Sequence, residues 1–320
     1  MNSGVVDSSL ATIGDTPVVR LQRIVPDDSA QVLVKIEAGN PTGSYKDRMA
    51  LAIIEEAQRR GYLKPGQRVV EYSGGSTGSS LAYVCAVKGH PCTIISSDTF
   101  SQEKIRTMRA FGADVVIVPS DHGLITPGLF ERMRHALDRI VEEEGAYWTD
   151  QFHNTDALIG YDALGQELLQ QTERSGIVID AFCAAVGTAG MLAGVSRTLK
   201  AALPQVFVTA LEPATSPMLS TGDAGPHHVE GIATGIVPPL LLSDLYDRVL
   251  TVDERTAREL AVPLARDEGV FAGTSSAFNI AGALHLAKEF GPGRTVATVA
   301  CDSGLKYLAG DLYERASTSN

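Results

Sequence analysis

Basic side chains are in the minority in this sequence. It holds 27 Lys and Arg residues against 38 Asp and Glu residues among 320, which gives a formal net charge of −11 at pH 7. Binding to nucleic acid or to an anionic membrane surface needs basic patches, so we expect neither kind of partner. A small anionic substrate is compatible with this charge, because local hydrogen-bond donors decide its binding.

Cysteine is also scarce. The four residues, Cys85, Cys92, Cys183 and Cys301, lie far apart and form no Cys-x-x-Cys pair. This pattern indicates reduced thiols in a cytosolic protein rather than a disulfide framework or a zinc site. No signal peptide opens the chain, and no run reaches the roughly 20 apolar residues that a membrane helix needs. We therefore expect a cytoplasmic protein without a membrane anchor or a metal site.

The sequence is rich in short β-branched segments that alternate with helical spacing of apolar residues. Such alternation predicts parallel strands joined by crossover helices. The predicted strands are 16–21, 31–36, 68–72, 92–96, 114–118, 178–184, 206–212, 248–252 and 295–300. The predicted helices are 49–60, 77–87, 102–111, 129–144, 156–171, 191–202, 254–268 and 277–289. Residues 213–239 form a long loop rich in glycine and proline, and such a loop is usually functional or mobile.

A lysine stands at a junction between a strand and a helix, in Asn-Pro-Thr-Gly-Ser-Tyr-Lys-Asp-Arg over residues 40–48. The turn residues bring the backbone close to whatever the lysine faces. The partial positive charge at the helix N-terminus favours a neutral amine, which is a nucleophile towards carbonyl groups. An isolated lysine at a helix start is more often a solvated residue, so the interpretation depends on the stretches that follow.

Three further turns are built from glycine and hydroxylated residues, and each lies ahead of a predicted helix. They are residues 71–78, 186–191 and 272–276. Free amides at such positions can hold an anion, and glycine allows the backbone to approach a ligand. Each turn taken alone is equally typical of ordinary packing or of a helix cap. The turn at 71–78 has neither the ending of a P-loop nor a Gly-x-Gly-x-x-Gly pattern, which argues against ATP and dinucleotide binding there.

In this order the four stretches resemble fold-type II pyridoxal-phosphate enzymes, and within them the family of cysteine synthase (O-acetylserine sulfhydrylase) and cystathionine β-synthase. The resemblance extends from Thr16-Pro17 to Lys306-Tyr307-Leu308. It includes Asp150-Gln151-Phe152 with Asn154, Glu212-Pro213, and Gly231-Ile232 with Gly235. It implies an α/β fold of the tryptophan synthase β type, with two three-layer domains, mostly parallel sheets and the active site between them.

The resemblance also implies a division of the chain. Residues 36–150 would form a smaller, mobile domain that carries the carboxylate-binding loop. Residues 1–35 together with 151–320 would form a larger domain that binds the cofactor. Relatives of this kind are typically homodimers, so a homodimer is expected.

Roles for individual residues follow from the same resemblance. Lys46 would bind pyridoxal 5'-phosphate as a Schiff base and act as the catalytic base. Residues that would hold the substrate are Ser73, Gly74, Gly75, Thr77, Gln151 and, near the substrate amine, Gly231. Residues that would hold the cofactor are Ser76 at the 3-oxygen, Gly187, Thr188, Ala189, Gly190 and Met191 at the phosphate, and Ser275 at the pyridine nitrogen, with Asp302 nearby.

A serine at the pyridine nitrogen has a chemical consequence. Unlike an aspartate, it does not stabilise a protonated ring, so the cofactor is a weaker electron sink and loss of a β-substituent as the α-proton departs is favoured. The implied reaction is β-replacement through α-aminoacrylate, in which sulfide or another small nucleophile attacks O-acetyl-L-serine or O-phospho-L-serine. The alternatives are an eliminating lyase, such as a cysteine desulfhydrase or a serine/threonine dehydratase, and a catalytically silent regulatory homologue.

Four positions depart from the family pattern. Ser76 stands where the family usually has asparagine, and Met191 ends the phosphate loop without the usual hydroxyl. Tyr45 is larger than the usual residue before the lysine. If Asp302 rather than Ser275 reached the pyridine nitrogen, the electron-sink argument would reverse. These departures leave the cofactor prediction unchanged and bear on the substrate.

Overall fold

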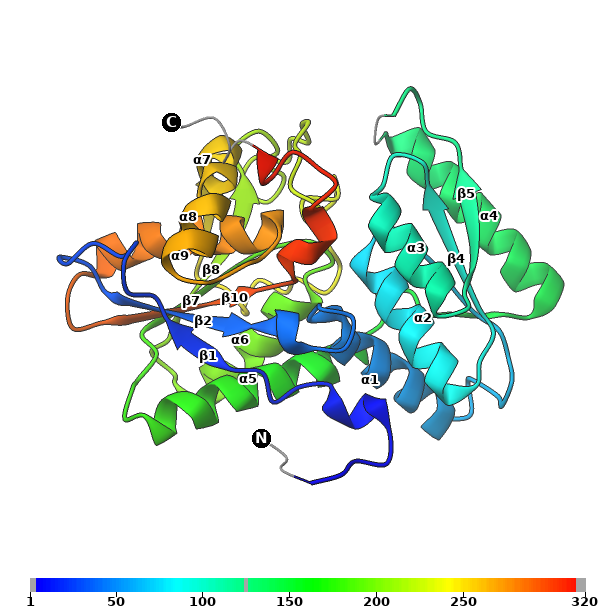
Figure 1. Cartoon of the computed structure of the whole chain (residues 1–320), viewed down its shortest axis with the longest axis horizontal. Coiled ribbons are helices and arrows are strands. Elements are labelled where there is room, and N and C mark those ends of the chain that lie inside the picture. Colours follow the sequence, from blue (N-terminus) through cyan, green and yellow to red (C-terminus); the bar gives the residue numbers. More distant parts are fainter. Residues whose placement is uncertain (1–3, 124–125, 315–320) are drawn as a thin grey trace. The chain divides into compact units, whose positions relative to one another are not determined.

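The computed structural model describes residues 4–123 and 126–314 and contains two compact units (Figure 1). The first unit runs to Ile13 and takes up the chain again from Asn40 to Gly160. The second holds Gly14–Gly39 and the chain from Tyr161 onward. These limits lie several residues from the predicted crossings at 35 and 150. The N-terminal arm goes with the first unit because Leu10 and Ile13 pack against its core.

The first unit is built on a parallel four-stranded sheet in the order β5-β4-β3-β6. Its strands are β3 (Val69–Tyr72), β4 (Cys92–Ser97), β5 (Asp114–Val118) and β6 (Tyr147–Trp148). Its helices are α1 (Lys46–Arg59), α2 (Ser76–Lys88), α3 (Gln102–Ala110) and α4 (Pro127–Glu144). Val69 packs with α1 and α2 on one face of the sheet, whereas Val70 packs with α4 on the other (Figure 1). Successive residues of a strand point to opposite faces, so both faces are covered.

The second unit is built on a six-stranded sheet in the order β1-β2-β10-β7-β8-β9. Only β1, at one edge, is antiparallel to its neighbour. The strands are β1 (Val18–Arg20), β2 (Gln31–Ile36), β7 (Ala181–Ala185), β8 (Phe207–Pro213), β9 (Arg248–Val252) and β10 (Thr295–Ala300). Helices α7 (Glu254–Glu259), α8 (Ala261–Asp267) and α9 (Thr274–Phe290) cover one face, and α5 (Ala157–Arg174) and α6 (Gly190–Ala202) the other (Figure 1). Short 3₁₀ turns occupy Ser9–Thr12, Glu37–Gly39 and Gly304–Tyr307.

The α/β class with mostly parallel sheets confirms the predicted fold class. Two elements differ from the sequence prediction. The helix expected over 254–268 is broken at Leu260, which separates α7 from α8. Pro263 explains the break, because its ring excludes the carbonyl four residues earlier from a continuous helix. The sequence also missed β6, whose two residues are too few to show a period.

Among the helices in the part of the chain that the structure describes, none is long and apolar enough to span a membrane.

Asn279 ties α9 to the ends of two strands that lead into the predicted site. It is fully buried, its Oδ1 accepts from the Ala185 amide at 2.7 Å, and its Nδ2 donates to the Val299 carbonyl at 2.9 Å. Ala185 ends β7 ahead of the turn at 186–191, and Val299 lies one residue before the end of β10. The side chain therefore fixes both strand ends against one helix.

We expect Asn279→Ala to lower the free energy of unfolding by about 3 kcal/mol, because the partly buried amide of Ala185 loses its acceptor and the buried carbonyl of Val299 loses a donor. Urea denaturation at a fixed cofactor concentration measures this loss. The control is His285→Ala, an exposed position on the same helix, where we expect a change below about 0.5 kcal/mol. Equal stability of the two variants would contradict this role for Asn279.

The four cysteines are buried, and none of them forms a disulfide bond among the described residues. Burial raises the pKa of the Cys183 thiol to about 12, and contact with Cys92, together with burial, raises that of Cys85 well above its usual range. With a pKa of about 12, roughly 10⁻⁴ of Cys183 is thiolate at pH 8. We therefore expect iodoacetamide to leave the folded protein unmodified at pH 8 and to alkylate it in denaturant. Rapid modification of Cys183 in the folded protein would show that it is not buried in this way.

Candidate active site

The turn that precedes α1 is held by the carboxylate of Asp47. Its Oδ2 accepts from the Thr42 amide at 2.8 Å, and its Oδ1 accepts from the Thr42 hydroxyl at 2.6 Å. The Gly43 amide closes the turn on the Asn40 carbonyl at 2.7 Å. Asp47 therefore stabilises the preceding turn from its place in the first turn of α1. A negative charge there also interacts favourably with the helix dipole.

Lys46 is the first residue of α1, and only 8% of it is exposed. Its Nζ lies 4.0 Å from Met49 Sδ and 5.1 Å from the centroid of the Tyr45 ring. Lys46 is thus enclosed at the start of a helix. This excludes the alternative interpretation of Lys46 as a solvated surface residue. Tyr45 stands beside its amine.

The start of α1 lies beside the start of α2. The two helices pack together, and the Thr42 hydroxyl lies 3.4 Å from the hydroxyl of Ser80 in the second turn of α2. The predicted lysine and the predicted carboxylate-binding loop, residues 73–78, are therefore at the same end of the helix pair.

The loop at 73–78 is shaped by its own serine. Ser73 Oγ accepts from the amides of Gly75 and Gly78, both at 3.1 Å. A Cβ added at Gly74 would lie 2.6 Å from the Phe100 ring, so the back of the loop packs closely there. The acceptor positions of Ser73 are thus used inside the loop, and its hydroxyl proton is what it offers to a ligand.

Gln151 lies against this loop although 74 residues separate it from Thr77. Thr77 donates its hydroxyl to Gln151 Oε1 at 2.7 Å, and Gln151 Nε2 donates to the Tyr72 carbonyl at 3.3 Å. These bonds orient the amide and engage one of its two Nε2 protons. The amides of Gly74, Ser76 and Thr77 have no acceptor among the described residues. This end of the first unit therefore presents several donors suited to a carboxylate.

Glu71 is a member of this region to which the sequence assigned no role. It is fully buried next to the end of β3, and burial raises the pKa of its carboxyl to about 7 although four hydrogen bonds act in the opposite direction. The sequence shows Glu71 as a charged residue in an otherwise apolar strand, which is the signal that could have indicated a role. Its hydrogen-bond partners could not be identified from the sequence, because they lie up to 80 residues away.

The turn at 186–191 in the second unit presents a run of donors at the start of α6. The amides of residues 187–192 have no acceptor among the described residues, although most of these residues are buried. Ala189, which precedes α6, has φ of +65°, a left-handed conformation that is uncommon outside glycine. Buried backbone donors require partners, and an anion at a helix N-terminus supplies them. Thr188 and Met191 lie in this turn, and Met191 is buried.

Gly187 and Gly231 are in direct contact. A Cβ at Gly187 would lie 2.1 Å from the Gly231 carbonyl oxygen, so only glycine fits at this position. The amide of Ala233 also donates to the Val186 carbonyl at 2.9 Å. The structure therefore joins the irregular segment around Gly231 to the phosphate-type turn, which the sequence did not indicate.

The two serines at the start of α9 have different environments. Ser276 Oγ accepts from the Cys301 amide at 2.8 Å and lies 3.4 Å from that of Asp302, so it holds the segment after β10. Ser275 is 8% exposed, and its hydroxyl has no partner among the described residues. The helix cap is Gly273, without a side-chain bond. Of the two, Ser275 has the hydroxyl that a ligand can reach.

Asp302 is engaged within the second unit. Its Oδ2 accepts from the Tyr307 hydroxyl at 2.9 Å, and a Cβ at Gly273 would lie 2.4 Å from its Oδ1. Burial, followed by the charge of Asp302, raises the pKa of Tyr307 above its usual range. The carboxylate therefore lies over the N-terminal end of α9.

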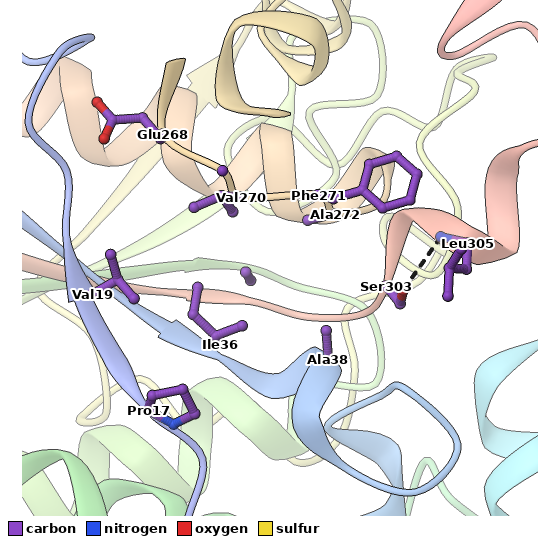
Figure 2. A pocket seen from close by; sticks show the side chains of 12 residues that line it. Pro17, Val19, Ile36, Ala38, Glu268, Val270, Phe271, Ala272, Ser303 and Leu305 are labelled. Atoms are coloured by element: carbon purple, nitrogen blue, oxygen red, sulfur yellow. Dashed lines mark hydrogen bonds between the residues drawn. The ribbon is translucent and has the colours of Figure 1, made fainter. Parts of the chain in front are cut away.

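A cavity of about 420 Å³ in the second unit contains none of the predicted site residues. Its lining is mainly apolar, with Val19, Ile36, Val270, Phe271 and Leu305 around it (Figure 2). Its carboxylate, Glu268, accepts from three backbone amides at residues 22–24. No cluster of three metal-ligating side chains occurs in the described ranges of the chain.

Known proteins resemble this chain over almost its whole length. A family model described as pyridoxal-phosphate dependent enzyme matches residues 10–302. The chain is 42% identical over 312 residues to a cysteine synthase of Staphylococcus aureus (strain Mu50 / ATCC 700699), covering 96% of this chain and 97% of that protein. It is 37% identical to an O-ureido-L-serine synthase of Streptomyces lavendulae, covering 96% and 93%. A crystal structure of O-ureido-L-serine synthase superposes with a TM-score of 0.91 at 36% identity, covering 99% and 98%.

The contact between Gly187 and Gly231 generates a prediction for cofactor binding. We expect Gly187→Ala to weaken pyridoxal phosphate binding at least roughly tenfold, or about 1.4 kcal/mol, because the added methyl displaces the turn. Absorbance titration of the apoprotein with the cofactor measures this affinity. Gly310→Ala is the control, since its Cβ meets only the Tyr307 carbonyl oxygen, at an ordinary 3.6 Å. Unchanged affinity in Gly187→Ala would mean that this turn does not hold the cofactor.

Proposed function

Because this chain belongs to the family of pyridoxal-phosphate dependent enzymes and performs β-replacement on an activated L-serine, we propose that it makes L-cysteine from O-acetyl-L-serine and sulfide. The 42% identity to a cysteine synthase over almost the whole of both chains favours this product. A relative of similar length is named for another product, O-ureido-L-serine, so the nucleophile is the part of the proposal that most needs testing.

The residues present fit the cofactor. The buried amides of residues 187–192, which have no acceptor in the described chain, suit its phosphate, and the enclosed amine of Lys46 suits its aldehyde. Ser275 has the hydroxyl suited to the pyridine nitrogen. When bound, pyridoxal phosphate withdraws electrons from the substrate α-carbon and thereby makes its proton acidic and its β-substituent labile.

The observation that carries the proposal is the set of donors around the loop at 73–78. The amides of Ser76 and Thr77, the hydroxyl of Ser73 and the second Nε2 proton of Gln151 all suit one α-carboxylate. Holding that carboxylate orients the α-carbon of an amino acid relative to Lys46 at the same end of the helix pair. Lys46 Nζ then accepts the α-proton as the general base.

Ser275 rather than Asp302 is the proposed partner of the pyridine nitrogen. Asp302 already accepts from Tyr307 and lies over Gly273, whereas the Ser275 hydroxyl has no partner in the described chain. A neutral hydroxyl does not stabilise positive charge on the ring, which favours departure of the β-substituent over other fates of the substrate. Ser76 in place of asparagine and Met191 at the phosphate are compatible with these roles, since backbone amides supply the main donors.

We also propose that the enzyme is a cytoplasmic homodimer with no nucleic-acid partner. The net charge of −11 and the lack of disulfide bonds among the four cysteines support this environment. Light scattering coupled to gel filtration measures the assembly, and a single monomeric peak would contradict a dimer.

A substrate panel tests the reaction. The holoenzyme is given O-acetyl-L-serine or O-phospho-L-serine, each with sulfide, a thiol or an amine, and amino-acid product, pyruvate and ammonia are measured. We expect L-cysteine from O-acetyl-L-serine and sulfide to form fastest. Pyruvate and ammonia as the main products, with sulfide present, would identify a lyase and refute the proposal.

Lys46→Ala provides the second test. We expect it to remove the visible absorption band of the bound cofactor and to lower turnover at least roughly a thousandfold, because both the covalent attachment and the base are lost. Circular dichroism should show an unchanged fold. The control is Lys64→Ala, which removes a lysine from an exposed position of the same unit and should retain both band and turnover. Retained turnover in Lys46→Ala would refute Lys46 as the base.

A further inference from the structure

The Glu71 carboxylate gathers four donors from both sides of the end of β3. Its Oε1 accepts from the Tyr72 amide at 2.9 Å and from Trp148 Nε1 at 3.2 Å. Its Oε2 accepts from the Thr149 hydroxyl at 2.6 Å and from the Gln151 amide at 3.1 Å. The two oxygens therefore have distinct tasks, since Oε2 alone holds the segment that carries the Gln151 side chain.

That segment has little other support from the sheet. Strand β6 ends at Trp148, and its pairing with β3 covers two residues. Beyond it, the Thr149 amide reaches the Val70 carbonyl at 3.3 Å, and Asp150 adopts φ of +46°. A non-glycine residue in the left-handed region is strained and persists where its surroundings hold it. Glu71 bridges this residue, because its Oε2 binds Thr149 before it and Gln151 after it.

From this geometry we propose that Glu71 is a positioning residue for the substrate carboxylate. It fixes Gln151 against Thr77, so that the donors around the loop at 73–78 are already arranged when the amino acid arrives. This inference rests on the proposed function, because it deepens the role given there to Gln151. It assigns Glu71 no contact with substrate or cofactor.

A carboxylate is the side chain that this position requires. Four donors converge on two oxygens, and an ionised carboxylate offers acceptor positions for all of them. Glutamine has nearly the same shape but one acceptor oxygen, so its Nε2 would face two of the four donors. Glu71→Gln therefore breaks the bridge with little change in volume.

The ionised form of Glu71 is the one that holds the bridge. Burial raises the pKa of this carboxyl to about 7. The other ionisable groups nearby are Tyr72 on the same strand, Asp150 in the bridged segment, and Arg134 of α4, whose guanidinium lies 4.0 Å from the centroid of the Trp148 ring. On protonation one oxygen becomes a donor, so substrate affinity should fall as the pH drops through about 7.

Stability should show the opposite dependence. The folded pKa of about 7 lies above the ordinary value of 4.5, so the folded state binds the extra proton between these limits. The contribution of Glu71 to stability is therefore present in full below about pH 4.5 and is lost as the pH rises through about 7. Ionisation of Glu71 should therefore raise substrate affinity while it lowers the stability of the fold. A residue that only supports the fold would not show these opposite pH dependences.

The test uses the holoenzymes of Glu71→Gln, Thr149→Val and Trp148→Phe. KM and kcat for O-acetyl-L-serine are measured from pH 6 to 8.5, and hydrogen exchange of the Gln151 amide is measured without substrate. We expect Glu71→Gln to raise KM roughly tenfold at pH 8 with kcat changed less than about threefold, and to speed that exchange roughly tenfold. The wild type should lose affinity for O-acetyl-L-serine below pH 7, and this loss should be absent in Glu71→Gln.

The other two variants separate the oxygens. Thr149→Val removes a donor to Oε2 and should raise KM roughly threefold, whereas Trp148→Phe removes a donor to Oε1 and should leave KM within about twofold. Glu71→Gln with the KM, pH profile and Gln151 exchange of the wild type would overturn the proposal, as would a lower melting temperature with unchanged KM. If Glu71→Gln fails to fold, an unchanged KM in Thr149→Val overturns it. If the wild type does not turn over O-acetyl-L-serine, the proposed function fails, and the exchange measurement still decides whether Glu71 fixes Gln151.

Discussion

Backbone amides without an acceptor among the described residues are the constraint on which the candidate site depends. They occur where β3 and β7 pass into α2 and α6, at the carboxyl ends of parallel strands. A buried amide without a partner is costly, so these turns are stable arrangements when anions occupy them. The fold thus presents backbone amides suited to an anion at two turns, one in each unit. A substrate carboxylate and a cofactor phosphate are the anions that the family's chemistry supplies.

The side chains around these turns mainly hold the backbone in place. Asp47 closes the turn before Lys46, Ser73 shapes the loop at 73–78, and Ser276 holds the segment after β10. Each uses its acceptors on amides of its own unit, which leaves other groups available to ligands. Some hydroxylated residues in a motif therefore hold the backbone, whereas others remain available to a ligand. Position in the sequence does not distinguish the two kinds.

The sequence was sufficient to predict the fold class and the turns that precede α1, α2, α6 and α9. Strands at 31–36, 114–118, 248–252 and 295–300 have the predicted limits, because β-branched runs bounded by turns are a local signal. Pro263 indicates a break between α7 and α8. The helical spacing of apolar residues around it nevertheless led to the prediction of one continuous helix. Which serine at 275–276 stays accessible, and where the Asp302 carboxylate lies, depend on contacts between β10 and α9. Such contacts have no signature within either segment. The same holds for Glu71, whose donors at 148–151 are distant in the sequence.

We propose that one enclosed lysine at the start of α1, Lys46, carries the cofactor. Borohydride reduction of the holoenzyme, followed by mass spectrometry of its peptides, fixes the cofactor to the lysine that binds it. Lys35 and Lys104, which are also buried, provide an internal comparison. We expect a phosphopyridoxyl group on Lys46 and on neither of these. A label on another lysine, or no label in protein that retains its yellow colour before reduction, would contradict it.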